Sequence, residues 1–384
     1  MKKKIKILGS GPTGSLLALF LASEDCNIDI VEPLSDVELL SRDKGYAITQ
    51  SSRRIFEKLG IWSSLEKVSF GFDSLSIIDN ETSQSVIVRT NDLRKFNKNQ
   101  SNIGWVIEHK HFMKILLDLI NSNIYINKST SDLKDDENFD FILAADGRES
   151  ETRKAWKTIY HKRFYKQRCI SFKAILKGLP TKRAYEIFKD QGPLALLPAG
   201  NDIYQVIWFS SIPKVKVQLK QDNSQLLSEL MNILPDNIYA KEIISKVSNY
   251  SLAKAFALPN FAGFNKILVG DSAHSFHPVG GQGLNSCIRD VYELSTLINN
   301  YESISVVKKK FFSIYYYFKR FGDIFSLLMV TDFLIKLFCN RLFFLYPIRS
   351  FIFFLLRSYK FIRCGVFSLM TDSLKGNLFL KNNF

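Results

Sequence analysis

The sequence is poor in cysteine and holds no cysteine pattern typical of a fold that is cross-linked by disulfides or by a metal. Its five cysteines lie far apart, and none forms a CxxC pair. An odd number of scattered cysteines argues against a disulfide framework or a zinc site, and it favours a reducing compartment. We therefore expect a cytoplasmic protein without a structural metal.

Long uncharged apolar runs are also missing. The chain begins MKKKIKILGSG, but the run IKIL is too short for the core of a signal peptide, and a glycine motif follows at once. The most apolar segments, 324–331 and 350–356, are separated by charged residues. No stretch reaches the ~18–20 residues needed to cross a bilayer, so we expect no transmembrane helix.

Acidic residues are scarce toward the C-terminus. The net charge is +15, and the segment from Ser303 to Phe384 holds 13 Lys or Arg against 3 Asp. A basic, aromatic segment indicates contact with an anionic surface, and this one is too apolar for a nucleic-acid arm. We expect a helical region at 305–384 that lies on the inner face of a membrane or docks a partner, and no nucleic-acid binding.

The N-terminal segment has the pattern of a strand, a glycine turn, a helix and a second strand. KIKIL is followed by GSGPTG, by the apolar run SLLALFLAS and by NIDIVE. This order predicts a βαβ unit and a parallel sheet. Gly9 permits the tight turn, Gly11 lets the backbone approach a pyrophosphate, and Gly14 allows close helix–strand packing. Glu32 ends the second strand and can accept hydrogen bonds from a ribose; a ligand-free glycine turn is the alternative.

A second motif follows the buried strand FDFILA. Asp146 and Gly147 form a turn, and Ser150 and Arg153 lie at spacings that let their side chains tie down the loop. An Asp-Gly turn with a nearby Arg is more often an ordinary surface loop, so this motif alone defines no site.

The most specific segment is GDSAHSFHPVGGQGLNSCIRD, residues 270–290. Asp271 ends a strand, where its carboxylate could bind ribitol hydroxyls. The glycines after Pro278 let bare backbone approach a flat ligand. A helix beginning near Leu284 would favour negative charge, such as that on one edge of a reduced flavin. The two histidines of the segment lack a third metal ligand nearby, so no metal site is expected.

The remaining pattern predicts a discontinuous first domain. Residues 51–67 are typical of a Ser-capped helix ending near Gly60, and residues 160–255 are β-rich before the strand-and-turn pattern returns. We expect an FAD-binding or NAD-binding domain interrupted by a β-rich substrate domain. The predicted boundaries are 1–75, 102–160 and 256–304 for the first domain, 76–101 and 161–255 for the second, and 305–384 for the helical region.

Together the three motifs resemble those of the para-hydroxybenzoate-hydroxylase-like FAD-dependent monooxygenases, which carry them in this order. Within these, the chain is most similar to the UbiH/VisC-like ubiquinone-biosynthesis hydroxylases. The blocks at 50–62, 104–117, 192–200 and 329–340 extend the similarity over nearly the whole chain. The resemblance implies an α/β fold with a Rossmann-like FAD-binding domain, an inserted β-rich substrate domain and a C-terminal helical region.

The resemblance also implies an activity. FAD would be the cofactor and NAD(P)H a transient co-substrate, and a phenolic, polyprenylated quinone-precursor ring would be hydroxylated with O2 through a C4a-hydroperoxyflavin. A quinone-biosynthesis complex is an implied partner. The residues assigned to the cofactors are Gly9, Gly11, Pro12, Thr13, Gly14 and Glu32 for the ADP half, Asp271 for the ribitol, Pro278, Gly280, Gly281, Gly283, Leu284 and Asn285 for the isoalloxazine, and Lys44, Lys110, Asp146, Gly147 and Arg153 for the flavin and nicotinamide contacts.

The sequence departs from the family at two of these positions. Lys44 and Lys110 stand where Arg is common, and lysine keeps the charge but loses the planar fork. No residue identifies itself as a substrate base: His109 and His277 are candidates, and either could be a structural histidine.

Two other functions stay open. A related halogenase is disfavoured because the four tryptophans are never two positions apart, as its WxWxIP signature requires, and a related prenyl reductase because the YxWxFP pattern is absent. A non-catalytic FAD-binding scaffold of a quinone-biosynthesis complex is disfavoured only by the intact motifs.

Overall fold

Three β-sheets organise the protein, which we describe from a computed structural model at residues 2–93, 100–131, 136–235, 238–259 and 263–372. The first sheet is parallel, with the order β16-β9-β1-β2-β8. Its strands are β1 (Lys3–Leu8), β2 (Cys26–Val31), β8 (Ile126–Ser129), β9 (Phe141–Ala144) and β16 (Lys266–Leu268). The parallel βαβ unit expected from the N-terminal sequence is confirmed.

Three helices bury this sheet. Helix α1 packs against both α5 and α9, and the apolar residues of all three join those of the strands in one core. Leu16, Leu17 and Ala18 of α1 are completely buried, which explains why that helix is apolar on nearly every side. The three helices are α1 (Pro12–Leu21), α5 (His109–Asn121) and α9 (Gln282–Asn299).

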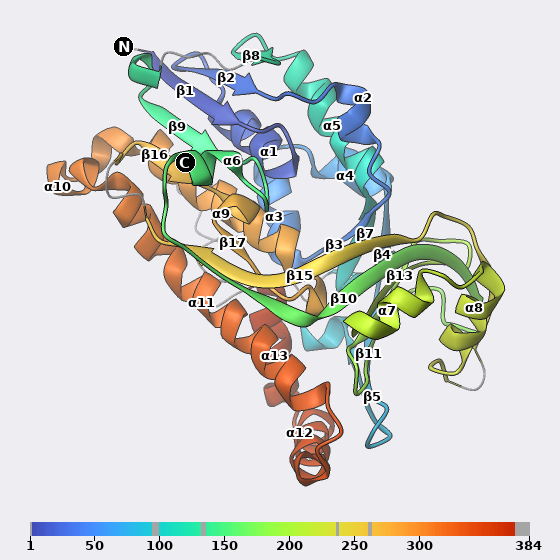
Figure 1. The fold of residues 1–384 in the computed structure, drawn as a ribbon. Helices are drawn as coiled ribbons and strands as arrows, with labels where there is room; N and C mark the ends of the chain where they lie inside the picture. The colour runs from blue at the N-terminus through green and yellow to red at the C-terminus, as the bar shows by residue number, and fades with distance from the viewer. Residues whose placement is uncertain (1, 94–99, 132–135, 236–237, 260–262, 373–384) are drawn as a thin grey trace.

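The second sheet is mostly antiparallel and takes its strands from separate parts of the chain. Its main order is β17-β15-β10-β13-β12-β11-β5-β6, with β14 paired to β10. Figure 1 shows β10 and β15 running together as long curved strands below the first sheet. The strands are β5 (Ser74–Asp79), β6 (Gln84–Arg89), β10 (Tyr160–Lys177), β11 (Arg183–Phe188), β12 (Leu194–Pro198), β13 (Ile203–Ser211), β14 (Tyr239–Ile243), β15 (Ser248–Ala257) and β17 (His274–Ser275).

A second core covers one face of this large sheet. Alternate residues such as Phe172, Tyr204 and Trp208 point into it together with apolar residues of α8 (Asn223–Met231). The other face of the sheet carries the intervening residues.

A small third sheet, β3-β7-β4, comprises β3 (Gly45–Ile48), β4 (Ser69–Phe72) and β7 (Gly104–Glu108).

The C-terminal region is helical, as expected. Helix α11 (Phe312–Phe338) packs on α9, and it is followed by α12 (Tyr346–Ser358) and α13 (Lys360–Asp372), which pack on each other. In Figure 1 these helices lie along the lower edge, and α12 projects beyond both sheets. Within the described ranges, no helix combines the length and the apolar character needed to cross a membrane.

A buried network of charges joins α11 to α9. Arg320 donates to Asp290 at 2.6 Å and contacts Asp323 at 2.7 Å, and Arg289 donates to Asp323 at 2.9 Å. Asp290 also bonds His274 Nε2 at 2.5 Å. All five side chains are at most 2 % exposed. Burial alone would raise the pKa of Asp290, but His274 and Arg320 outweigh it and lower that pKa.

The expected end of a helix near Gly60 is confirmed, but the expected serine cap is wrong. Helix α3 (Gln50–Lys58) begins after Thr49 without a side-chain cap, and a second helix, α4 (Trp62–Lys67), follows. The hydroxyls of Thr49 and Ser52 bind the Asn285 side chain instead, at 3.1 and 2.7 Å. The Thr49 and Ser52 hydroxyls therefore make a tertiary contact with Asn285 and do not cap the helix locally.

Candidate active site

The predicted cofactor residues gather at the carboxyl ends of four neighbouring parallel strands. Gly9 follows β1, Glu32 follows β2, Asp146 follows β9, and the segment containing Asp271 follows β16. In open parallel sheets this edge is where ligands bind, because helix N-termini and strand ends meet there. Sequence positions up to 262 residues apart thus share one edge.

The first glycine turn is closed tightly at two positions and open at the third. A Cβ on Gly14 would lie 1.8 Å from the Gly9 carbonyl oxygen, and one on Gly9 would lie 2.7 Å from the carbonyl oxygen of Ala145. Around Gly11, by contrast, no atom lies within 4 Å of the added carbon. The turn therefore keeps open space beside the N-terminus of α1, where Pro12 and Thr13 begin the helix and free N–H groups favour phosphate.

Glu32 is held rigidly beside this turn. Its carboxylate accepts a hydrogen bond from the Ser10 N–H at 2.7 Å and another from the Leu34 N–H at 3.0 Å. Each carboxylate oxygen has further acceptor capacity, and the acid carries no donor when ionised. A fixed acceptor beside a phosphate-sized space suits a ribose.

The second motif is a buried junction and not a surface loop. Arg153 is 4 % exposed, donates to the Ser272 carbonyl at 2.7 Å and to the Arg148 carbonyl at 3.0 Å. The Ser150 hydroxyl accepts from the Arg153 N–H at 2.9 Å, so the expected loop ties are confirmed. One oxygen of Asp146 is buried and has no hydrogen-bond partner among the described residues, and Gly147 follows it with a φ of +87°.

The third motif meets the first directly. Gly270 has a φ of +66°, and a Cβ there would lie 2.9 Å from the Thr13 hydroxyl and 3.1 Å from the Cys287 sulfur. Cys287 in turn contacts Asp271, with 3.7 Å between the sulfur and the carboxylate. Only glycine permits this approach, so the two motifs form one surface.

The last glycines form the turn that starts α9. Gly280 and Gly281, which follow Pro278 and Val279, both have positive φ, at 71° and 65°. A Cβ added to Gly280 would lie 2.5 Å from the end of the Met370 side chain, whereas nothing lies within 4 Å of a Cβ added to Gly283 in the first turn of the helix. The turn therefore presents backbone, with open space at Gly283.

Asn285 holds that turn in place. Its amide nitrogen donates to the carbonyls of Ala47 and Gly281, both at 2.8 Å, and its oxygen accepts from Thr49 and Ser52. The side chain is occupied by these bonds. Its contribution to a flavin site would therefore be the placement of β3 against the glycine turn.

Lys44 directly precedes strand β3, and Tyr46 lies within it. Lys44 is exposed. Desolvation lowers the pKa of Lys44, and the Asp271 carboxylate opposes this effect. The Tyr46 hydroxyl bonds His109 Nδ1 at 2.8 Å, and His109 Nε2 bonds the Leu39 carbonyl at 2.7 Å. Lys110 directly follows His109 and is exposed in the first turn of α5.

Neither candidate histidine is placed as an available base. Both ring nitrogens of His109 are hydrogen-bonded, and burial lowers the pKa of His109. His277 is fully buried, accepts from the Val279 N–H at 3.2 Å and faces Gln167 at 3.3 Å. Burial lowers the pKa of His277 to about 3. Two neutral, partnered rings are typical of structural histidines.

Sequence analysis missed Glu186. It lies on β11, 8 % exposed, where it accepts a backbone hydrogen bond from Gly280, and its Oε1 has no partner among the described residues. Burial raises the pKa of Glu186 to about 7. A signal was present: in AYEIF the acid occupies an inward position between Ala184 and Phe188, where an alternating strand otherwise places apolar residues.

Comparisons with known proteins agree with this geometry. A family model described as an FAD binding domain matches residues 118–302. An uncharacterized protein of Synechocystis is 26% identical over 79% of both chains, and the 3-demethoxyubiquinol 3-hydroxylase of Escherichia coli is 23% identical over 78% of this chain and 80% of its own. The crystal structure of the p-nitrophenol 4-monooxygenase PnpA from Pseudomonas putida matches with a TM-score of 0.76 and 14% identity, over 95% of this chain and 96% of that one.

The matched domain and the monooxygenases among the relatives support an FAD-dependent aromatic monooxygenase, and the fold agrees with that activity. The fold is of the para-hydroxybenzoate-hydroxylase-like type, and the relatives that the chain resembles include ubiquinone hydroxylases at low sequence identity. NAD(P)H is the electron donor typical of these enzymes. The residues present fit FAD, because the turn is open at Gly11, the Glu32 acceptor is fixed, and Asp146 has an unpaired oxygen at the same edge.

The open space at Gly11 gives a direct test of the cofactor site. We expect Gly11→Ala to fold normally, because its φ of −65° suits alanine and no atom opposes the new methyl group. The methyl would occupy the space assigned to the pyrophosphate, so FAD affinity measured by fluorescence titration should fall at least about tenfold, or ~1.4 kcal/mol. Gly322→Ala, on α11 and equally unobstructed, is the control and should bind FAD as the wild type does. Unchanged affinity in Gly11→Ala would remove this turn from the cofactor site.

The buried acid gives a second test. Because the pKa of Glu186 is raised from 4.5 to about 7, its protonation favours the folded state, and that contribution is lost as pH rises from about 4.5 through 7. Neutral Glu186→Gln should therefore be more stable than the wild type at pH 8 by about 2–4 kcal/mol, and equal to it near pH 4.5, in urea unfolding of the FAD-free protein. The exposed Glu242→Gln on β14 should show no such pH-dependent difference. Equal stabilities of Glu186→Gln and wild type at pH 8 would contradict a protonated, buried acid.

Proposed function

We propose that this protein hydroxylates a phenolic ring of a polyprenylated quinone precursor, using O2 and NAD(P)H. The observation that carries the proposal is the convergence of three glycine motifs on one edge, with Gly270 against Thr13 and Gly9 against Ala145. The ubiquinone hydroxylases among the relatives support the substrate class.

FAD, when bound, supplies hydride acceptance and oxygen activation. The protein's own residues then bind and orient the reactants. Glu32 and the α1 N-terminus would hold the ADP half, and Asp271 the ribitol. The α9 N-terminus, behind Gly280 and Gly281, places its dipole so that it favours negative charge on the reduced ring.

The ring of the substrate would lie between the glycine turn and the large sheet. Glu186 reaches from β11 to the Gly280 backbone, so this face of the sheet closes over the turn. Phe209 on β13 packs against His277 with ring centroids 4.8 Å apart, which supplies an apolar wall that excludes water. Glu186, with one oxygen unpaired, is the polar group available there to receive or return a phenolic proton.

Incorporation of isotopically labelled dioxygen tests the activity. Holoprotein supplied with a 2-prenylphenol, NADH or NADPH and heavy-isotope O2 should yield a product with one labelled hydroxyl, seen by mass spectrometry, and the phenol should accelerate NAD(P)H oxidation. Unlabelled hydroxyl, or no hydroxylated product from any prenylphenol despite tightly bound FAD, would favour the scaffold or the reductase. The Gly11→Ala variant is the matched control, since it should lose product together with FAD.

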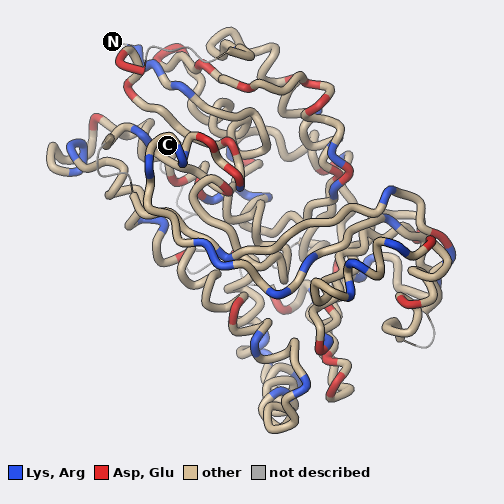
Figure 2. The backbone as a smooth tube through the Cα atoms, in the orientation of Figure 1, with Lys and Arg blue, Asp and Glu red and all other residues tan. Residues whose placement is uncertain are grey.

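We propose further that the C-terminal helices lie on an anionic membrane surface. Large apolar side chains are exposed along them, including Phe343 at 80 %, Phe361 at 74 % and Phe351 at 58 %. Figure 2 shows basic residues on the same projecting helices. Aromatic residues flanked by cations are the combination that binds the interface of an anionic bilayer.

Vesicle flotation tests this contact. The triple variant Phe343→Ser, Phe351→Ser, Phe361→Ser should lose most of its binding to phosphatidylglycerol vesicles, because it removes the apolar surface that would enter the interface. The matched control replaces equally exposed residues elsewhere, Val37→Ser, Ile124→Ser and Ile159→Ser, and should float as the wild type does. Equal flotation by both triple variants would contradict docking through α12 and α13.

A further inference from the structure

A cavity of about 590 Å³ lies between helix α11 and strands β10 and β15. Its volume is that of a small-molecule site. None of the residues assigned to the cofactor lines it: Ala273 and His274 contribute to its wall, whereas Asp271, two residues before Ala273, does not. It is thus separate from the proposed site of hydroxylation.

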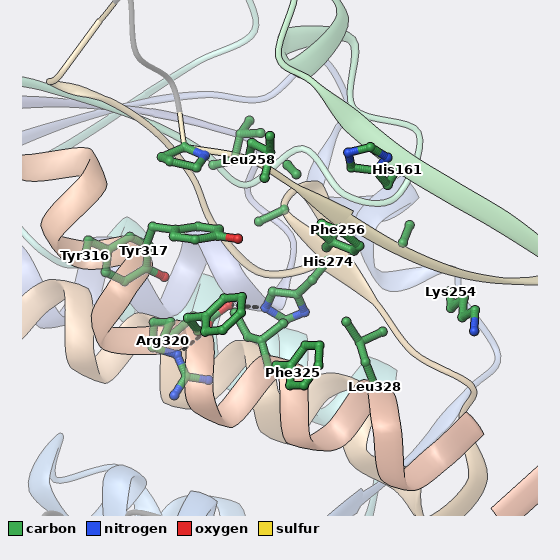
Figure 3. A pocket seen from close by; sticks show the side chains of 18 of the residues that line it. His161, Lys254, Phe256, Leu258, His274, Tyr316, Tyr317, Arg320, Phe325 and Leu328 are labelled. Carbon is green, nitrogen blue, oxygen red and sulfur yellow. Dashed lines mark hydrogen bonds and ion pairs between the residues drawn. The ribbon is translucent and has the colours of Figure 1, made fainter. Parts of the chain in front are cut away.

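The exposed lining of this cavity is mostly apolar, although charged residues contribute to it. Phe325 and Leu328 of α11 lie across it from Phe256 of β15, as Figure 3 shows. Tyr317 and Leu258 lie toward one end, and Lys254 lies toward the other. A cavity of this kind gains most from a ligand that brings apolar surface and few polar groups.

Most polar groups at the base of the cavity are already in use. His274 and Arg320 both bond Asp290, and Arg320 also bonds Asp323, whereas His274 Nδ1 is buried without a hydrogen-bond partner among the described residues. A sugar, nucleotide or peptide would need more hydrogen-bond donors and acceptors than this wall leaves available. At the rim, the Lys254 ammonium pairs with an Asp332 carboxylate oxygen at 2.9 Å, and the Lys162 ammonium pairs with a Glu149 carboxylate oxygen at 2.9 Å. Arg163 is a further cation in the lining.

The mouth of the cavity continues into an exposed apolar stripe. Phe318, Phe321, Phe325, Met329 and Phe333 follow one another at three- or four-residue spacing along α11, and each is at least 42 % exposed. Phe321, Phe325 and Met329 also line the cavity. Phe321 and Phe325 stack, with ring centroids 5.5 Å apart. Such a stripe is the surface along which a hydrocarbon chain can pass from a lipid phase into the protein.

We propose that this cavity binds a flexible hydrocarbon chain, either isoprenoid or fatty-acyl, that enters along the α11 stripe. The site is distinct from the flavin site and does not depend on the proposed hydroxylation. Because His274 and Asp290 form its base and Asp290 accepts from the Gly270 N–H at 3.1 Å, a bound chain would pack against the network that supports the flavin-side loop.

A fluorescent polyene fatty acid tests the site on the FAD-loaded full chain. It should bind saturably, and Leu328→Trp, which fills the cavity, should weaken binding at least tenfold. Met329→Glu, which places a charge at the mouth, should weaken it similarly. Leu119→Trp, at an exposed position on α5, is the control and should bind as the wild type does. FAD content and the melting temperature report whether each variant is folded.

Competition then identifies the chain. Displacement by farnesol but not palmitate assigns an isoprenoid chain, and the reverse assigns an acyl chain. Displacement by both supports a hydrocarbon site without chain selectivity, whereas displacement by a short phenol would place the probe in the hydroxylation cleft and overturn the proposal. Absence of saturable binding, or equal binding by Leu328→Trp, would overturn it as well.

Discussion

The assembly depends on Asp290, a carboxylate buried at the junction of three parts of the fold. It accepts from Arg320 of α11, bonds His274 of β17, and accepts from the Gly270 N–H at the end of the parallel sheet. Removing one partner from such a network leaves an uncompensated charge in a low-dielectric interior, which typically costs about 3–5 kcal/mol. The network therefore holds the α11 helix and the glycine-bearing loop in one fixed relation, even if it adds little net stability.

With that relation fixed, small residues become obligatory where backbones meet. Gly270 approaches Thr13, Gly9 approaches Ala145, and Gly14 lies against the Gly9 carbonyl. Gly11 is the exception, because a Cβ added there would have open space around it. The GxGxxG motif thus contains two kinds of glycine. A Cβ at Gly9 or Gly14 would clash with neighbouring backbone, so these glycines are needed for packing, whereas a Cβ at Gly11 would only fill the space proposed for the ligand.

The proposed flavin site and the apolar cavity use neighbouring residues of one loop. Asp271 and the α9 turn belong to the proposed flavin site, and Ala273 and His274 line the cavity. This arrangement gives a polar, backbone-rich edge for a cofactor and an apolar chamber beside the exposed face of α11. The neutral histidines near the flavin side strengthen its apolar character, and Glu186, like Asp146, is an acid there with one buried oxygen that has no partner among the described residues.

The sequence by itself determined the fold class and the location of the cofactor edge, because both follow from local patterns. The order strand, glycine turn, helix, strand can form only a parallel unit, and GxGxxG has the same steric meaning wherever that unit occurs. The β-rich insert and the helical C-terminus were likewise visible in periodicity and composition.

Only tertiary structure decided which polar groups met. Thr49 binds Asn285 instead of capping α3, His109 is sequestered by Tyr46 and Leu39, Glu186 faces Gly280 from a strand 94 residues earlier, and α11 encloses a cavity with β10 and β15. These partners are far apart in sequence and are selected by packing, for which no local residue pattern is a sufficient signal.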